Sequence, residues 1–158
     1  MLKYVETMVV FTEIPDEITL AINISNCPCH CPGCHSKYLW EDKGKDLTQR
    51  VLDRLITSND GITCVCFMGG DSEPDLVNLL AERVHSFGLK SAWYSGKESI
   101  SDKIDLKNFD YVKIGPYIEE KGPLTCKTTN QVLFEIKDLK LEDITYKLQK
   151  SDTETCLQ

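Results

Sequence analysis

The feature that most constrains this chain is a run of four cysteines within eight residues, Cys27-Pro-Cys29-His-Cys31-Pro-Gly-Cys34. The chain has eight cysteines in all. Its first residues carry an early acid and no small-residue cleavage site, and no apolar run approaches the roughly 20 residues of a membrane span. We therefore expect a cytoplasmic protein. In that reducing compartment, a dense cysteine cluster predicts metal or redox chemistry before disulfides.

The acidic composition argues against nucleic acid as a partner. The chain has 18 Lys and Arg against 25 Asp and Glu, a net charge of -7 that repels a polyphosphate. Hydrophobic residues make up 41% of the 158 residues and charged residues 27%, an ordinary globular balance. We expect a single domain over residues 1–158, with a flexible C-terminal tail from about residue 151, and no membrane partner.

Strand and helix signals alternate along the chain from residue 18 onward. Apolar residues at every second position over 18–24 predict a strand that leads directly into the cysteines. One-sided apolar spacing predicts helices over 48–59 and 72–87, the second starting with a capping box at Ser72 and Asp75. This alternation predicts right-handed βα units around a parallel sheet. Residues 1–16 show no clean period, and the remaining signals are strands at 62–68, 90–95, 111–114 and 132–136 and a weak short helix at 100–109.

The spacing of three of the cysteines, C-x3-C-x2-C, suits an iron–sulfur cluster. Thiolates at Cys27, Cys31 and Cys34 hold three corners of a 4Fe–4S cube, which leaves the fourth iron open for a ligand. The alternative is a zinc knot closed by Cys29. Structural zinc sites use two separated C-x2-C pairs, which this run does not match, so we interpret Cys29 as a bystander. Cys64 and Cys66, two apart in an apolar run, are interpreted as small buried hydrophobes.

This cysteine spacing, with the turn Gly69-Gly70-Asp71 after the next βα unit, resembles the radical S-adenosylmethionine superfamily. Within it, the chain is similar to the activating proteins of anaerobic (class III) ribonucleoside-triphosphate reductases, from about residue 18 to residue 132. The resemblance implies an α/β fold, a trimmed partial (βα) barrel with a parallel sheet and helices on its outer face. The other residues that carry the resemblance are Lys37, Trp40, Trp93-Tyr-Ser-Gly96, Gly115-Pro-Tyr-Ile-Glu-Glu120 and Asn130-Gln131.

The resemblance also implies an activity. One 4Fe–4S cluster on Cys27, Cys31 and Cys34, which are the catalytic and metal-binding residues, cleaves S-adenosylmethionine reductively. The resulting 5′-deoxyadenosyl radical generates a glycyl radical on the large subunit of the anaerobic reductase. A low-potential donor such as flavodoxin or ferredoxin supplies the electron.

Further residues are expected to contact the cofactors. Glycines let the backbone approach a ligand closely, and a carboxylate at position 71 accepts a hydrogen bond from the methionine ammonium. Most of the superfamily has Glu at that position of the turn, one methylene longer than the Asp of this chain. The expected cofactor-binding residues are Gly33, Cys34, His35, Gly69, Gly70, Asp71 and Ser95.

Two other functional classes stay open at this point. One keeps the radical chemistry but directs it at another glycyl radical enzyme or a small molecule. The other is a non-enzymatic zinc or iron–sulfur binding module, whose closed site would ignore S-adenosylmethionine.

Overall fold

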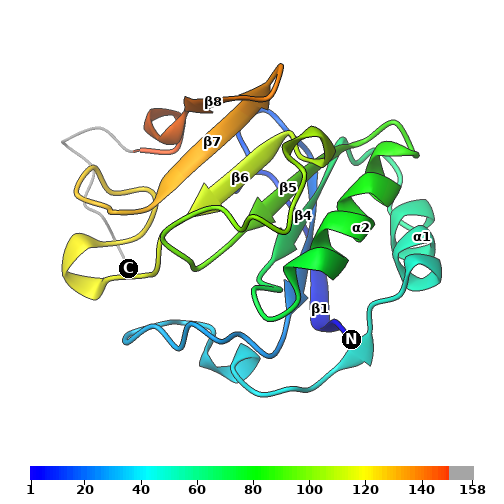
Figure 1. The fold of residues 1–158 in the computed structure, drawn as a ribbon, viewed down its shortest axis with the longest axis horizontal. Helices are drawn as coiled ribbons and strands as arrows, with labels where there is room; N and C mark the ends of the chain where they lie inside the picture. The colour runs from blue at the N-terminus through cyan, green and yellow to red at the C-terminus, as the bar shows by residue number, and fades with distance from the viewer. Residues whose placement is uncertain (150–158) are drawn as a thin grey trace.

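The computed structural model describes residues 1–149, which form one mixed sheet of eight strands (Figure 1). The strand order is β3-β1-β2-β4-β5-β6-β7-β8. The central strands β2, β4, β5 and β6 are parallel, whereas the strands on either side pair antiparallel. Their bounds are β1 (Lys3–Val10), β2 (Thr19–Ile24), β3 (Lys45–Asp46), β4 (Cys64–Met68), β5 (Lys90–Tyr94), β6 (Tyr111–Ile114), β7 (Val132–Lys137) and β8 (Lys140–Asp143).

Two α-helices in the described part of the chain connect the parallel strands and cover the same face of the sheet, α1 (Gln49–Thr57) and α2 (Pro74–His85) (Figure 1). The Thr48 side chain caps α1 by accepting a hydrogen bond from the Val51 N–H. The capping box predicted for α2 at Ser72 is wrong. Its N-cap is Glu73, which makes no capping hydrogen bond, and Pro74 supplies a preset φ at the first helical position.

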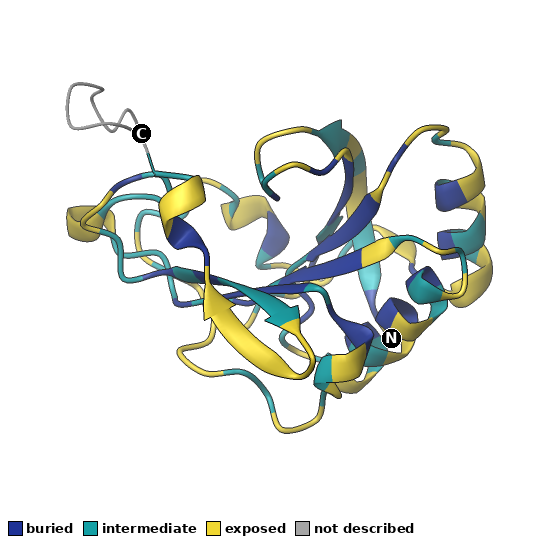
Figure 2. Cartoon of the chain, turned by 90° about the horizontal axis from the view of Figure 1, so that it is seen from above, coloured by how far each residue is buried: buried dark blue, intermediate teal, exposed yellow. Residues whose placement is uncertain are grey.

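The parallel strands separate two layers of core, as alternation along a strand requires. On β4, Val65 and Phe67 face the helices, whereas Cys64 and Cys66 pack on the opposite face with Leu133 of β7. Figure 2 shows the central strands buried and β8 exposed. The interpretation of Cys64 and Cys66 as buried hydrophobes is confirmed, because both side chains are fully buried and burial raises the pKa of each thiol.

The expected parallel barrel with helices on its outer face is wrong. After β6 the chain returns antiparallel as β7 and β8 instead of continuing through a helix to another parallel strand. The connection from β6 to β7 contains Gly115, Pro116, Gly122 and Pro123, and glycine and proline favour turns over helix. The result is a mixed sheet with helices on one face.

Other local predictions divide into confirmed and corrected ones. The strands predicted at 18–24, 62–68, 90–95, 111–114 and 132–136 appear as β2, β4, β5, β6 and β7. The helix predicted at 100–109 is reduced to a single 3-10 turn, Leu106–Asn108. The tail predicted from residue 151 lies outside the described residues. No helix of the described part is long and apolar enough to span a membrane.

Candidate metal centre

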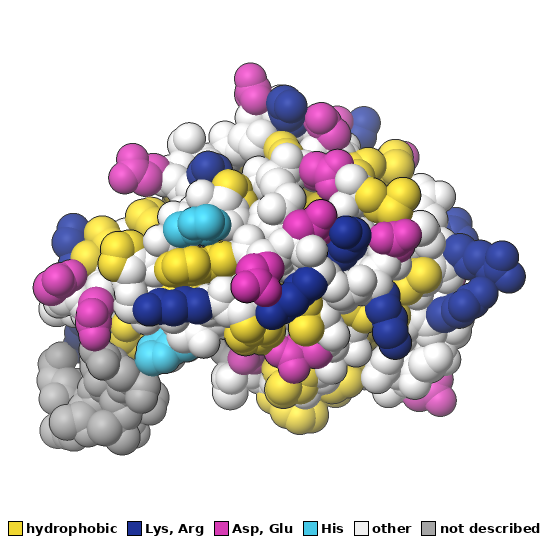
Figure 3. Space-filling view, turned by 90° about the horizontal axis from the view of Figure 1, so that it is seen from below, with side chains coloured by type: hydrophobic (Ala, Val, Ile, Leu, Met, Phe, Trp, Pro, Cys, Tyr) yellow, Lys and Arg dark blue, Asp and Glu magenta, His cyan; other side chains and the backbone are white. Residues whose placement is uncertain are grey.

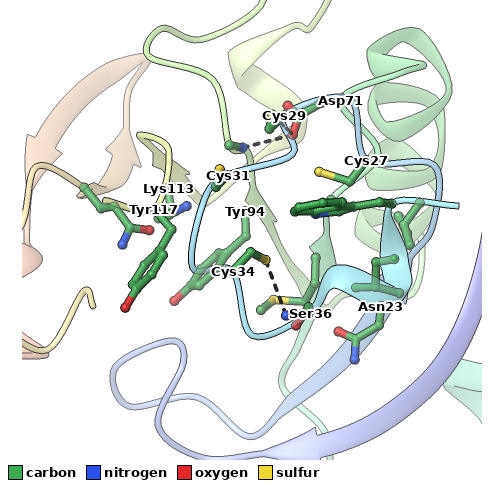
Figure 4. Close-up of a pocket in the computed structure, with 17 residues that line it drawn as sticks. Asn23, Cys27, Cys29, Cys31, Cys34, Ser36, Asp71, Tyr94, Lys113 and Tyr117 are labelled. Carbon is green, nitrogen blue, oxygen red and sulfur yellow. Dashed lines mark hydrogen bonds between the residues drawn. The ribbon is translucent and has the colours of Figure 1, made fainter. Parts of the chain in front are cut away.

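The loops that leave the parallel strands meet at the carboxyl edge of the sheet, where α/β proteins bind their ligands. They enclose a pocket of about 210 Å³. Its walls come from the cysteine loop after β2, the Gly69 turn after β4, the end of β5, and Lys113 near the end of β6 (Figure 4). The segment after β2 also supplies Trp40, whose ring stacks on His30 with 4.7 Å between centroids.

All four cysteines of the sequence cluster line this pocket. The base of their loop is held by the Cys27 N–H, which donates to the Leu39 carbonyl at 3.0 Å. A tight turn brings Cys31 and Cys34 together, with the Cys34 N–H donating to the Cys31 carbonyl at 3.1 Å. The turn has the residues of a type II turn. Proline occupies its first central position, and Gly33 occupies the second with φ +77°.

The two cysteines nearest the start of the loop are electrostatically coupled. Hydrogen bonding between the Cys29 and Cys27 sulfurs lowers the pKa of Cys27 to about 6 and raises the pKa of Cys29. Cys27 is therefore the readier thiolate, the form in which cysteine binds metal. The Cys29 thiol also lies 3.9 Å from Asp71 Oδ2, which links the cysteine loop to the turn after β4.

Asp71 is oriented by the loop after β5. The Ser95 hydroxyl donates to Asp71 Oδ1, and the Gly96 N–H donates to Oδ2 at 2.9 Å. Ser95 is buried and lies behind Asp71 rather than in the pocket wall. A Cβ at Gly96 would lie 2.8 Å from the Cys29 sulfur, so only glycine allows this close approach of the two loops.

The other predicted cofactor residues lie in different positions. Gly69 lines the pocket, and its carbonyl accepts from the Trp93 indole N–H at 2.8 Å. Gly70 faces the core instead, where a Cβ would lie 2.6 Å from Val77 Cγ2. Gly33 and His35 stand outside the pocket wall, His35 with its ring 5.8 Å from that of Tyr117.

Several pocket residues were not predicted as site residues. Tyr94, Tyr117 and Gln131 contribute to the wall, as does the buried Lys113. Lys113 interrupts the apolar strand between Val112 and Ile114, which was a usable signal because lysine is almost never fully buried without a partner. Burial lowers the pKa of Lys113 to about 8, against the opposing attraction of Asp71 and the cysteines.

The chemistry of the donors fits an iron–sulfur cluster. In residues 1–149 no three His, Cys, Asp or Glu side chains gather closely enough to hold one metal ion. A 4Fe–4S cluster requires wider spacing of its ligands than a single metal ion, because each cysteine thiolate binds a different iron at a corner of the cube. Cys27, Cys31 and Cys34 supply thiols from three points of one pocket wall, and Met68 and Tyr94 add apolar surface.

Comparison with known proteins agrees with this chemistry. A family model described as a 4Fe-4S single cluster domain matches residues 18–133, the segment from the start of β2 to the start of β7. No curated protein and no solved structure gives a significant match. Since the matched segment is well over half of the chain, this protein belongs to the 4Fe-4S single cluster domain family.

Proposed function

We propose that this protein is a radical S-adenosylmethionine activating enzyme for an anaerobic ribonucleoside-triphosphate reductase. The observation that carries the proposal is the convergence of Cys27, Cys31, Cys34 and Asp71 on one pocket at the carboxyl edge of the parallel strands. Three thiolates leave one iron of a 4Fe–4S cluster without a cysteine, which is the vacancy that a chelating substrate needs. The reaction itself is inferred from the sequence resemblance to the activating proteins of anaerobic reductases.

The reaction balances with one external electron. When bound and reduced by a low-potential donor of the flavodoxin or ferredoxin class, the cluster supplies the electron that cleaves the bond between sulfur and C5′ of S-adenosylmethionine, releasing methionine. The 5′-deoxyadenosyl radical then takes a hydrogen atom from a glycine Cα of the reductase. The products are 5′-deoxyadenosine and a glycyl radical.

The chain's own part is to bind and orient the substrate. Asp71, held by Ser95 and the Gly96 N–H, accepts a hydrogen bond from the substrate ammonium. Gly69 lines the pocket without a side chain, so a bound substrate can approach this part of the chain closely. Trp40 and Tyr117 provide aromatic walls that exclude water from the radical.

The large subunit of the reductase is the proposed partner. Figure 3 views the molecule from below, the side on which the segment after β2 lies in Figure 1. Acidic and basic side chains are interspersed with hydrophobic ones across this face. A mixed surface of this kind suits a protein partner better than nucleic acid, which selects clustered basic residues.

Cys29 favours a second candidate function, a closed four-thiolate cluster for electron transfer. It lines the same pocket as the other three cysteines. With Cys29 as fourth ligand, no iron would be open to S-adenosylmethionine, and the module would carry electrons without a substrate.

One experiment separates the two candidates. The protein is reconstituted anaerobically with iron and sulfide, reduced, and examined by electron paramagnetic resonance with and without S-adenosylmethionine. The activating enzyme gives a cluster signal that shifts with S-adenosylmethionine, survives Cys29→Ala and disappears in Cys31→Ala. A signal that requires Cys29 and ignores S-adenosylmethionine contradicts the proposal.

The target is tested by adding the reductase and S-adenosylmethionine to the reduced protein. A glycyl radical signal on the reductase, absent with Cys31→Ala, is the expected result. Cleavage to 5′-deoxyadenosine without that radical would transfer the activity to another glycyl radical enzyme or a small molecule.

A further inference from the structure

Lys113 is a buried cation in the wall of the cysteine pocket. It stands on β6 with only 8% of its surface exposed, and the pocket it lines is the one lined by the four cysteines of the loop. Figure 4 shows it on the Cys31 side of the pocket. A lysine in such a place requires compensation, because an uncompensated buried charge is strongly unfavourable.

The compensation from the protein is incomplete. Lys113 Nζ donates to the carbonyls of Ser95 and Gly115, each at 3.0 Å, and lies 5.8 Å from the centre of the Tyr94 ring. An ammonium group has three N–H donors, and the described residues supply hydrogen-bond acceptors for two of them. Among residues 1–149, no carboxylate forms an ion pair with Lys113.

Four acidic groups act on Lys113. Asp71, Cys29 and Cys31 line the pocket, and Cys66 is a thiol buried on the same face of the sheet as Lys113. Three thiolates on a cluster make that site more negative still, and each added electron increases the negative charge. Net charge and burial are two of the terms that set the reduction potential of such a cluster.

We propose that Lys113 is the buried counter-charge of the iron–sulfur cluster and raises its reduction potential. The ammonium favours the reduced cluster over the oxidised one because it attracts the extra negative charge through a water-poor medium. Lys113 is a positioning residue in this sense, since it acts on the cluster without binding iron. The inference rests on the cluster of the proposed function and does not require S-adenosylmethionine.

The test is a redox titration of the reconstituted full chain, with dithionite as reductant and the reduced-cluster resonance as readout. In Lys113→Met the ratio of reduced to oxidised cluster at the wild-type midpoint falls about tenfold, which corresponds to about 59 mV for one electron. Lys113→Gln, which keeps a polar side chain but removes the charge, shifts in the same direction. Lys113→Arg retains the charge and stays close to wild type.

A matched control uses Lys97, an exposed lysine on the loop that follows β5. Its charge also acts on Cys29, but water and salt screen it. Lys97→Met therefore gives a much smaller shift than Lys113→Met. Equal shifts in these two variants, or unchanged potentials in both neutral Lys113 variants at full iron content, overturn the inference and reduce Lys113 to a structural role.

The outcome is separable from that of the proposed function. If the cluster ignores S-adenosylmethionine but its potential falls in the neutral Lys113 variants, the proposed function fails and the inference stands. If S-adenosylmethionine shifts the signal while the potential is insensitive to Lys113, the inference fails alone. A wild-type protein that assembles no cluster contradicts both.

Discussion

At the residue scale, Gly70 shows how tightly the turn after β4 is packed. It has φ +93°, a conformation that favours glycine, and an added Cβ would lie 2.6 Å from Val77 Cγ2 on α2. Its neighbour Gly69 lines the pocket, and Asp71 follows directly. The close packing of Gly70 against α2 therefore fixes the positions of its two neighbours in the site, Gly69 and Asp71.

We predict that Gly70→Ala destabilises the protein more than an alanine at a glycine with free space around it. Gly61 is the matched control, since it has φ +84° and a Cβ added there would have no atom within 4 Å. Both variants bear the backbone strain, but only Gly70→Ala adds overpacking of about 1–3 kcal/mol. Urea denaturation of both variants measures the difference. Equal losses would show that Val77 moves aside freely.

Single residues were predictable where their chemistry required a pattern. Three cysteines of the loop were predicted as site residues because thiolate ligands on a short loop have a characteristic spacing, and all three line one pocket. Ser95 stays a predicted cofactor contact, and in the structure its hydroxyl donates a hydrogen bond to Asp71. Lys113 was missed because the periodicity of a strand indicates only which face of the sheet a residue lies on. It does not indicate which loops, distant in the sequence, cover that face.

At the element scale, the amino ends of the parallel strands are joined by a polar network on the side opposite the pocket. Glu17, just before β2, is buried and accepts hydrogen bonds from Lys90 Nζ at 2.6 Å and from the Tyr111 hydroxyl at 3.1 Å. Thr63, just before β4, donates to the same carboxylate at 2.5 Å. One side chain therefore ties together the starts of β2, β4, β5 and β6.

We predict that this network makes stability depend on pH in the acidic range. Burial raises the pKa of Glu17, but the hydrogen bonds from Lys90, Thr63 and Tyr111 outweigh it and bring the pKa below its usual value. The charged carboxylate therefore stabilises the fold above an unfolded-state pKa of about 4.3. This contribution is lost as the pH falls through the lower folded-state pKa.

Glu17→Gln tests this contribution. At pH 7 it lowers the free energy of unfolding by about 1–3 kcal/mol, and between about pH 5 and 3 it flattens the pH dependence. Urea denaturation followed by tryptophan fluorescence gives both quantities. Exposed Glu98, changed to Gln, leaves the curve as it is in the wild type. A Glu17→Gln curve parallel to the wild-type curve would show that the network does not titrate.

Elements were predictable when one periodicity ran through them. β1 was not recognised because its pairing with β2 shifts register between Tyr4 and Glu6, which breaks the alternation of buried and exposed positions. The helix expected at 100–109 fails because its few apolar residues do not extend one face over several turns, and Asp105 caps only a 3-10 turn.

At the scale of the whole molecule, the cysteines of the loop and the two cysteines of β4 occupy different places. The loop cysteines lie at the carboxyl edge, whereas Cys64 and Cys66 are buried within the layer that packs against β7. The parallel part of this sheet followed from the alternating signals. Its antiparallel flanks did not, because strand pairing between distant segments leaves no local pattern.

We predict that the double variant Cys64→Ala, Cys66→Ala binds as much iron as the wild type. Both thiols are buried on the face away from the helices, and burial keeps them protonated. The changes cost about 1 kcal/mol for each lost sulfur, as for one buried methyl group. Iron analysis after reconstitution gives the ratio of iron to protein. Cys31→Ala is the comparison with lost iron, and a similar loss in the double variant would place a buried cysteine on the metal.

The last strand of the sheet bears on how the protein behaves at high concentration. All four residues of β8 are exposed, and three of them, Lys140, Glu142 and Asp143, are charged. A short edge strand with charged side chains is a poor template for the addition of another chain. The opposite edge, β3, has only two residues, Lys45 and Asp46, again of both signs. Both edge strands therefore oppose the pairing of copies into a continuous sheet. This favours a protein that stays dispersed at the high concentrations that spectroscopy of the metal centre requires.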